Sequence, residues 1–333
     1  MKLLCTLLLA LAASASAQLK PPKSPVKTSP VKTWTAARTA DGQPDLQGVW
    51  TNATITPLER PADLGDKAFF TEQEAADYEK RTFAQITGDR RDGGPEADVG
   101  RSYNEFWRDR GTKVVGTRRT SLINDPPDGK VPALTPEAQK KQADARAYQR
   151  LHPSDGPEDR NLWERCLSRG LPIVPGPYNN DFQIQQSPGY VVIFHEMVHE
   201  ARVIPLDGRP HASPDIRQWM GDGRGHWEGD TLVVDTTNFS EKSNFRGASS
   251  GLHLVERFTR TGPDSIRYEF RVEDPTTFTK PWSAEMPMGK MDTPIFEYAC
   301  HEGNYAMSGL LGGARADERK DAEKKAAAQS KSK

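Results

Sequence analysis

Hydrophobic and polar residues alternate without a break over residues 266–273, where Ile266, Tyr268, Phe270 and Val272 are separated by charged side chains. A period of two places successive side chains on opposite faces of a strand, so this segment predicts a β-strand with one buried face. Shorter apolar or alternating runs predict further strands over residues 182–186, 190–194, 201–206, 231–235, 252–260 and 295–300.

Turn signals separate these runs, including Ser187-Pro-Gly189, Asp207-Gly208 and Trp227-Glu-Gly-Asp230. Short strands with frequent turns and no helix between them predict antiparallel pairing. We therefore expect a mainly β fold, an antiparallel barrel or sandwich, and we prefer the barrel because closure protects strand edges and can leave a ligand cavity. The segment Gly48-Val-Trp50 is similar to the Gly-x-Trp opening of lipocalin-type barrels, but we favour the simpler interpretation of a tryptophan that fills the core.

A few peripheral helices are expected in the N-terminal half. Thr71 and Glu74 can form a capping box for a helix that begins after Phe70. Thr135 can cap a second helix, with Pro136 in its first turn and a mostly polar body that ends near Arg150. Residues 158–169 are expected to form a third, short helix that is stopped by Gly170 and Pro172.

The chain divides by composition into four parts. Residues 1–17 have a positive start, a short apolar run and the small-residue site Ala15-Ser-Ala17, which is typical of a secretory signal peptide. Residues 18–45 contain the repeat SPVKT and are expected to form a disordered linker, residues 46–312 a single β-rich domain, and residues 313–333 a charged tail that is disordered or a frayed helix. The mature protein is therefore expected to be periplasmic or secreted, with no membrane span.

Charge and cysteine content narrow the interpretation further. The chain has 45 Lys and Arg against 46 Asp and Glu, so no overall field attracts nucleic acid. Two cysteines, Cys166 and Cys300, remain after the predicted cleavage. An even number in an oxidising compartment favours a disulfide; buried free thiols, catalysis or metal binding are the alternatives.

The sequence His195-Glu-Met-Val-His199 matches the HExxH pattern of zinc hydrolases. That pattern binds zinc when it lies on a helix, where both imidazoles share a face. Here both flanks are rich in β-formers and Pro205 blocks a helix, so we expect the chain to turn near residues 195–200 and expect no metal site or cofactor. A zinc hydrolase is retained as a minor alternative.

Other residues are candidates for acid–base chemistry or ligand binding. Glu256 shares a predicted strand face with Leu252, Leu254 and Phe258, and an inward carboxylate is costly unless it is paired with a cation such as Arg202 or Arg257. Glycine-rich loops carry further polar side chains, which can equally serve as turn chemistry. The candidate catalytic residues are Glu256, Asp235, His211 and His301, and the candidate ligand-binding residues are Arg202, Trp227, Arg224 and His253.

Four stretches together resemble a group of exported bacterial proteins that are usually described only as hypothetical. They are Asp207-Gly-Arg-Pro-His211, the run Trp227–Phe239 (WEGDTLVVDTTNF), Val255-Glu-Arg-Phe258, and the run Ile295–Tyr305 (IFEYACHEGNY). The resemblance covers residues 45–312. It implies a bacterial, exported protein and carries no activity.

Three functional hypotheses follow from the sequence. The first is a non-enzymatic barrel that holds a small, partly apolar molecule, with Glu256, Arg202 and Trp227 fixing its orientation. The second is an exported hydrolase or lyase in which an inward carboxylate and a histidine act as acid and base. The third is an envelope interaction protein, which would show a large exposed apolar patch and no cavity.

Overall fold

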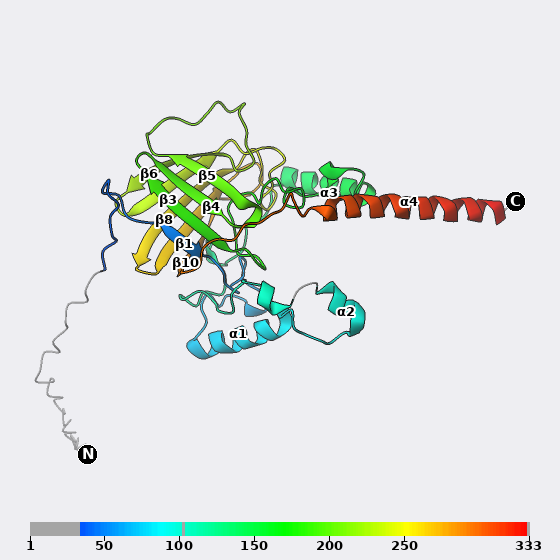
Figure 1. Cartoon of the computed structure of the whole chain (residues 1–333), viewed down its shortest axis with the longest axis horizontal. Helices are drawn as coiled ribbons and strands as arrows, with labels where there is room; N and C mark the ends of the chain where they lie inside the picture. Colours follow the sequence, from blue (N-terminus) through cyan, green and yellow to red (C-terminus); the bar gives the residue numbers. More distant parts are fainter. Residues whose placement is uncertain (1–33, 102–103, 332–333) are drawn as a thin grey trace, which may run out of the picture. The chain divides into compact units, whose positions relative to one another are not determined.

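A computed structural model describes residues 34–101 and 104–331, and Thr35 onward folds as one compact unit. The predicted signal peptide and most of the predicted linker lie outside the described residues. Within the described range the chain forms a nearly closed antiparallel β-barrel, shown in Figure 1, as the sequence predicted. No helix in this range is long and apolar enough to cross a bilayer.

The barrel is one antiparallel sheet with the strand order β5-β4-β3-β1-β10-β9-β8-β7-β6, and β2 pairs with β10 beside this path. Most neighbours in the sheet are also neighbours in sequence: tight turns join β3 to β4, β6 to β7 and β8 to β9, whereas longer connections join β7 to β8 and β9 to β10. The strands are β1 (Gly48–Thr51), β2 (Ile123–Asp125), β3 (Asp181–Ser187), β4 (Tyr190–His195), β5 (Glu200–Pro205), β6 (Asp222–Glu228), β7 (Thr231–Thr237), β8 (His253–Gly262), β9 (Ser265–Glu273) and β10 (Trp282–Met291).

Alternate side chains of these strands fill the barrel interior. On β9 the predicted pattern is confirmed, since Ile266, Tyr268, Phe270 and Val272 are all buried. Trp50 is also fully buried and donates from Nε1 to the carbonyl of Leu46 at 2.9 Å, so it fills the core. Packing of this kind leaves little free volume inside.

The two ends of the sheet, β5 and β6, meet through side-chain packing, and no backbone ladder joins these two strands. Glycines of β6 allow the close approach. A Cβ atom at Gly225 would lie 2.6 Å from a methyl of Leu206 and 2.8 Å from Ile204, and Gly223 also faces Ile204. The joint between the edge strands therefore depends on positions that lack a side chain.

The helices are α1 (Glu72–Ile86), α2 (Gly94–Gly100), α3 (Pro136–Leu151) and α4 (Tyr305–Lys331), with single 3₁₀ turns at Ala62–Leu64, Glu105–Trp107, Pro157–Asp159 and Met197–His199. Both predicted caps are confirmed. Thr71 and Glu74 form the capping box of α1, and the Thr135 hydroxyl accepts from the N–H of Ala138 at the start of α3.

Two local predictions were wrong. Residues 158–169 contain only the 3₁₀ turn Pro157–Asp159, because Cys166 adopts a left-handed φ of 55° that breaks a helix. Residues 295–300 form no strand, because backbone N–H groups of this segment bond to side chains at the barrel end. Of the two alternatives for the charged tail, a disordered segment or a frayed helix, the structure has a helix, since residues 305–331 form α4 in Figure 1.

The predicted disulfide is confirmed. Cys166 and Cys300 are bonded, with their Cα atoms 5.7 Å apart and a sequence separation of 134. The bond attaches the segment that follows β10 to the loop that precedes β3. We call residues 292–300 of that segment the strap.

Candidate functional site

The HExxH sequence forms the end of a β-hairpin, as predicted. His195 ends β4, Glu200 begins β5, and the two residues are paired across the hairpin. His195 is buried, and burial lowers the pKa of its imidazole to about 4, so the ring is neutral at physiological pH. Its Nδ1 lies 3.1 Å from the carbonyl oxygen of Met197, while Nδ1 of His199 accepts from the N–H of Tyr298 at 3.3 Å. The two imidazoles therefore serve local structure and do not share a helix face.

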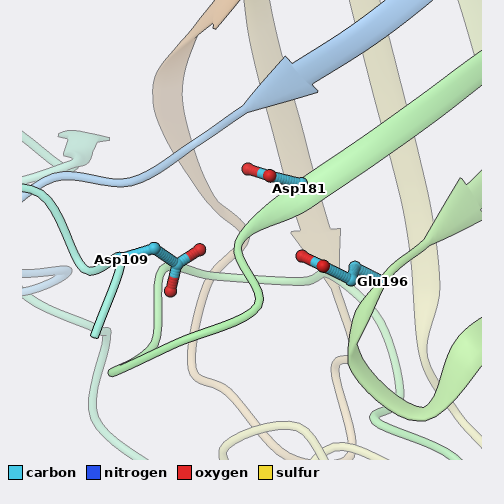
Figure 2. Close-up of side chains that lie close together, drawn as sticks. All are labelled: Asp109, Asp181 and Glu196. Atoms are coloured by element: carbon cyan, nitrogen blue, oxygen red, sulfur yellow. The ribbon is translucent and has the colours of Figure 1, made fainter. Parts of the chain in front are cut away.

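The glutamate of the same sequence takes part in a different site. Carboxylate oxygens of Asp109, Asp181 and Glu196 all lie within 4.8 Å of one another (Figure 2). We call these three residues the carboxylate cluster. Asp181 begins β3 and Glu196 follows β4, so the hairpin places them side by side, with the Glu196 N–H donating to the carbonyl of Asp181 at 3.0 Å. Asp109 comes from the loop after the 3₁₀ turn Glu105–Trp107.

Hydrogen bonds from neighbouring groups hold the carboxylates of Asp109 and Glu196 in place. The backbone N–H of Asn180 donates to Asp109 Oδ2 at 2.9 Å, and its side-chain amide donates to Oδ1 at 3.3 Å. The backbone N–H of Phe296, in the strap, donates to Glu196 Oε1 at 3.2 Å. The cluster is therefore preorganised by three segments that are distant in the sequence.

The electrostatics of the cluster are unusual. Glu196 is 4% exposed and Asp181 is 9% exposed. Burial raises the pKa of both carboxyl groups, and each is raised further by the negative charge of Asp109 nearby. Among the residues that the structure describes, no lysine or arginine forms an ion pair with any of the three. The cluster therefore favours a bound positive charge, which can be a proton, a metal ion or an organic cation.

A pocket of about 700 Å³ opens beside the cluster. We call it the end pocket. Its lining includes Asp109, Asp181 and Glu196, the cation Arg108, and aromatic side chains from three segments. The strap supplies Phe296 and Tyr298, the Glu105–Trp107 turn supplies Phe106 and Trp107, and the loop before β3 supplies Tyr178. Phe106, Trp107 and Phe296 are largely exposed, so their rings are available to a ligand.

The candidates predicted from the sequence lie elsewhere, in two groups. Glu256 is 1% exposed in the barrel interior, where Oε1 accepts from Arg202 Nη1 at 3.0 Å and from the Tyr268 hydroxyl at 2.8 Å. The cavity beside this pair measures about 10 Å³, which is no more than the space of one water molecule. The space beside Glu256 therefore leaves no room for an organic ligand, and Trp227 packs against the same core. Arg202 also lines a separate pocket of about 540 Å³, which is formed by β5 and residues 217–223.

The second group forms a chain on the outer face of the sheet. His211 lies between two carboxylates, with Nδ1 3.1 Å from Asp222 and Nε2 3.0 Å from Asp235. Asp235 also contacts Nε2 of His253 at 2.8 Å, which raises the pKa of His253 and lowers that of Asp235. Arg224 pairs with Asp222. The predicted contact between a carboxylate and a histidine thus exists, but it faces away from the barrel interior; Asp222 also lines the pocket of about 540 Å³ beside β5.

The remaining candidate, His301, is exposed just after the disulfide, and no contact brings it to Glu256 or Asp235. The sequence reasoning missed Asp109 and Asp181 entirely and considered Glu196 only as a zinc-site base. One signal was present: Asp181 and Glu196 flank a predicted hairpin at equal distance from its two turn residues, Pro188 and Gly189. A comparison of the chain with protein-family models and with curated proteins found no match.

Proposed function

We propose that the protein is an exported binding protein whose end pocket holds a small organic cation with an apolar or aromatic body. The observation that supports this most directly is the carboxylate cluster: three acids within 4.8 Å of one another, without a cationic side-chain partner among the described residues, in a pocket lined by aromatic rings. This proposal keeps the partly apolar ligand expected from the sequence and moves it from the barrel interior to the barrel end.

A cationic head group on the ligand would balance the negative charge of the carboxylate cluster. Two nearly buried carboxylates beside a third repel one another, and a ligand ammonium placed between them would relieve that repulsion. The rings of Trp107 and Phe296 can add cation–π attraction, which contributes about 0.5–2 kcal/mol in other proteins. A volume of about 700 Å³ is in the range that drug-sized ligands occupy.

A second candidate function uses the same residues. Asp181 and Glu196 have raised pKa values, and their carboxylate oxygens lie within 4.8 Å of each other, a separation comparable to that of the acid and the nucleophile in retaining glycoside hydrolases. In that case the protonated acid would donate to a leaving group while the other stabilises positive charge. This is the hydrolase alternative with Glu196 and Asp181 in place of Glu256 and Asp235.

Three probes of equal shape test the proposed binding: 2-phenylethylammonium, 2-phenylethanol and phenylacetate, measured by isothermal titration calorimetry. We expect the ammonium to bind at least about tenfold more tightly than the alcohol, because a desolvated ion pair adds one to three kcal/mol, and the carboxylate to bind least. Glu196→Gln should remove most of this preference, and Trp107→Ala should weaken both the ammonium and the alcohol.

Glu323→Gln is the matched control, since Glu323 is exposed on α4 and the substitution makes the same change in charge. Equal affinity for ammonium and alcohol, or a Glu196→Gln protein with unchanged preference, would contradict the proposal. Stoichiometric calcium binding without ammonium preference would replace the organic cation with a metal ion. Turnover of an aryl glycoside or ester that is lost in both Glu196→Gln and Asp181→Asn would favour the hydrolase.

A further inference from the structure

A second pocket, of about 420 Å³, has the opposite charge. We call it the basic pocket. It lies between residues 158–170 and residues 242–244, and its charged lining comprises four cations and one acid: Arg160, Arg165, Arg169, Lys242 and Glu158. It shares no lining residue with the end pocket.

Three of the four cations already have carboxylate partners. Arg160 forms a two-pronged contact with Glu164, at 3.0 Å to each oxygen. Glu158 accepts from Arg165 at 2.7 Å and from Lys242 at 2.9 Å, so one carboxylate serves two cations. The acids in and around the pocket are therefore fully engaged.

Arg169 is different. Its guanidinium stacks on the ring of Trp163, with the guanidinium carbon 5.9 Å from the ring centre. Within the described part of the chain this guanidinium forms no ion pair and donates no hydrogen bond, although the Arg169 backbone N–H donates to Glu200. A planar group with five donors is thus held in place by an aromatic face, and its donors point to no protein acceptor.

Two amides add to the surplus of donors. The side-chain oxygen of Asn161 accepts from the N–H of Glu164, and that of Asn244 accepts from the N–H of Gly247. These contacts orient each amide, and neither side-chain NH₂ group donates to another described residue. Both residues line the basic pocket, so its unused polar groups are donors.

We propose that the basic pocket binds an oxyanion, a phosphate or a carboxylate, carried by a small molecule. Arg169 is the principal ligand-binding residue, with its guanidinium oriented by Trp163, and the amides of Asn161 and Asn244 complete the donor set. Charge-assisted hydrogen bonds from a preorganised arginine fork are the strongest interactions available to such a group. The site is independent of the proposed cation site, because the two pockets differ in residues and in charge.

The test measures binding of inorganic phosphate, phenyl phosphate and benzoate to the full chain by titration calorimetry at low ionic strength. We expect at least one of the three to bind, and Arg169→Gln to weaken that binding by about tenfold to a hundredfold. Arg169→Lys should give an intermediate loss, because it keeps the charge and removes the fork. The probe that binds most tightly distinguishes phosphate from carboxylate. Tighter binding of phenyl phosphate than of inorganic phosphate would show that Trp163 and Leu162 contact the aromatic ring of the ligand.

Arg319→Gln is the control, since Arg319 is exposed on α4 and the charge change is the same. Thermal unfolding of each variant verifies that it is folded. Binding that falls equally in Arg169→Gln and Arg319→Gln would reveal general charge attraction and overturn the proposal. An absence of binding by all three probes to the unsubstituted protein at millimolar concentration would overturn it as well.

Discussion

Two buried glutamates, Glu256 inside the barrel and Glu196 at its end, differ in what surrounds them. Glu256 is paired with Arg202 and receives a hydrogen bond from Tyr268, so its charge is balanced within the protein. Glu196 lies beside Asp181 and Asp109, and it accepts a hydrogen bond from the backbone N–H of Phe296. A buried charge that the fold neutralises serves the fold, whereas one that the fold leaves with like charges indicates a ligand.

The first and largest prediction concerns the balanced glutamate. Glu256→Gln or Arg202→Leu should destabilise the protein by about 3–5 kcal/mol, because each leaves an unpaired charge in the core. The double variant Arg202→Met/Glu256→Leu should recover most of that loss. Urea unfolding followed by tryptophan fluorescence measures all three. If either single variant were as stable as the unsubstituted protein, the ion pair would not be structural, and the contrast between Glu256 and Glu196 would be wrong.

The second prediction has the opposite sign. Asp181→Asn or Glu196→Gln should stabilise the unliganded protein at neutral pH by about 0.2–1 kcal/mol, since like charges placed opposite each other across a hairpin destabilise it. The same unfolding measurement applies, with Glu323→Gln as the charge-matched control. Destabilisation above 2 kcal/mol, roughly the cost of a lost structural pair, would make Glu196 a structural residue like Glu256.

The pH dependence sharpens this second prediction. The pKa values of Asp181 and Glu196 are raised in the folded state, so these groups favour folding at acid pH and this contribution is lost as pH rises through the folded pKa. The stability gained by Glu196→Gln should therefore be small at about pH 4 and larger at about pH 7. A gain that is constant over this range would assign the effect to packing.

The third and smallest prediction concerns the outer-face histidines. Asp235 raises the pKa of His253, so the protonated ring stabilises the fold below its ordinary pKa of 6.5 and this contribution is lost as pH rises through the folded value. Because the pair is partly exposed, His253→Gln should cost only about 0.5 kcal/mol at mildly acid pH and almost nothing at alkaline pH. Unfolding at both pH values measures the difference, and an equal loss at both would exclude the charge as its cause.

The sequence predicted the barrel because its signal is local. Most of the predicted strands show their own alternation or a continuous apolar run, and Glu256 had to be paired because it shared a face with leucines. Arg202 was one of two partners considered, and its place on β5 makes it the one that faces inward.

The carboxylate cluster was not predicted because its signal is not local. Asp109 lies in a loop without periodicity, and only the folded chain places that loop beside the β3–β4 hairpin. The strap was mistaken for a strand because Ile295–Cys300 has strand-like residues, while its N–H groups bond to Glu196 and His199. Hydrogen bonds from backbone N–H groups to distant side chains, as in the strap, produce no periodic pattern in the sequence.

The joint between β5 and β6 gives the barrel a natural line of weakness. Every other pair of neighbouring strands in the barrel is joined by backbone hydrogen bonds, whereas β5 and β6 are held together by the packing of Ile204 and Leu206 against Gly225. A methyl group at position 225 would clash with Leu206 and Ile204 and push the two strands apart. Closure of the barrel, and with it the exclusion of water from the Arg202–Glu256 pair inside, therefore depends on glycine at position 225, because every other residue would place a carbon atom there.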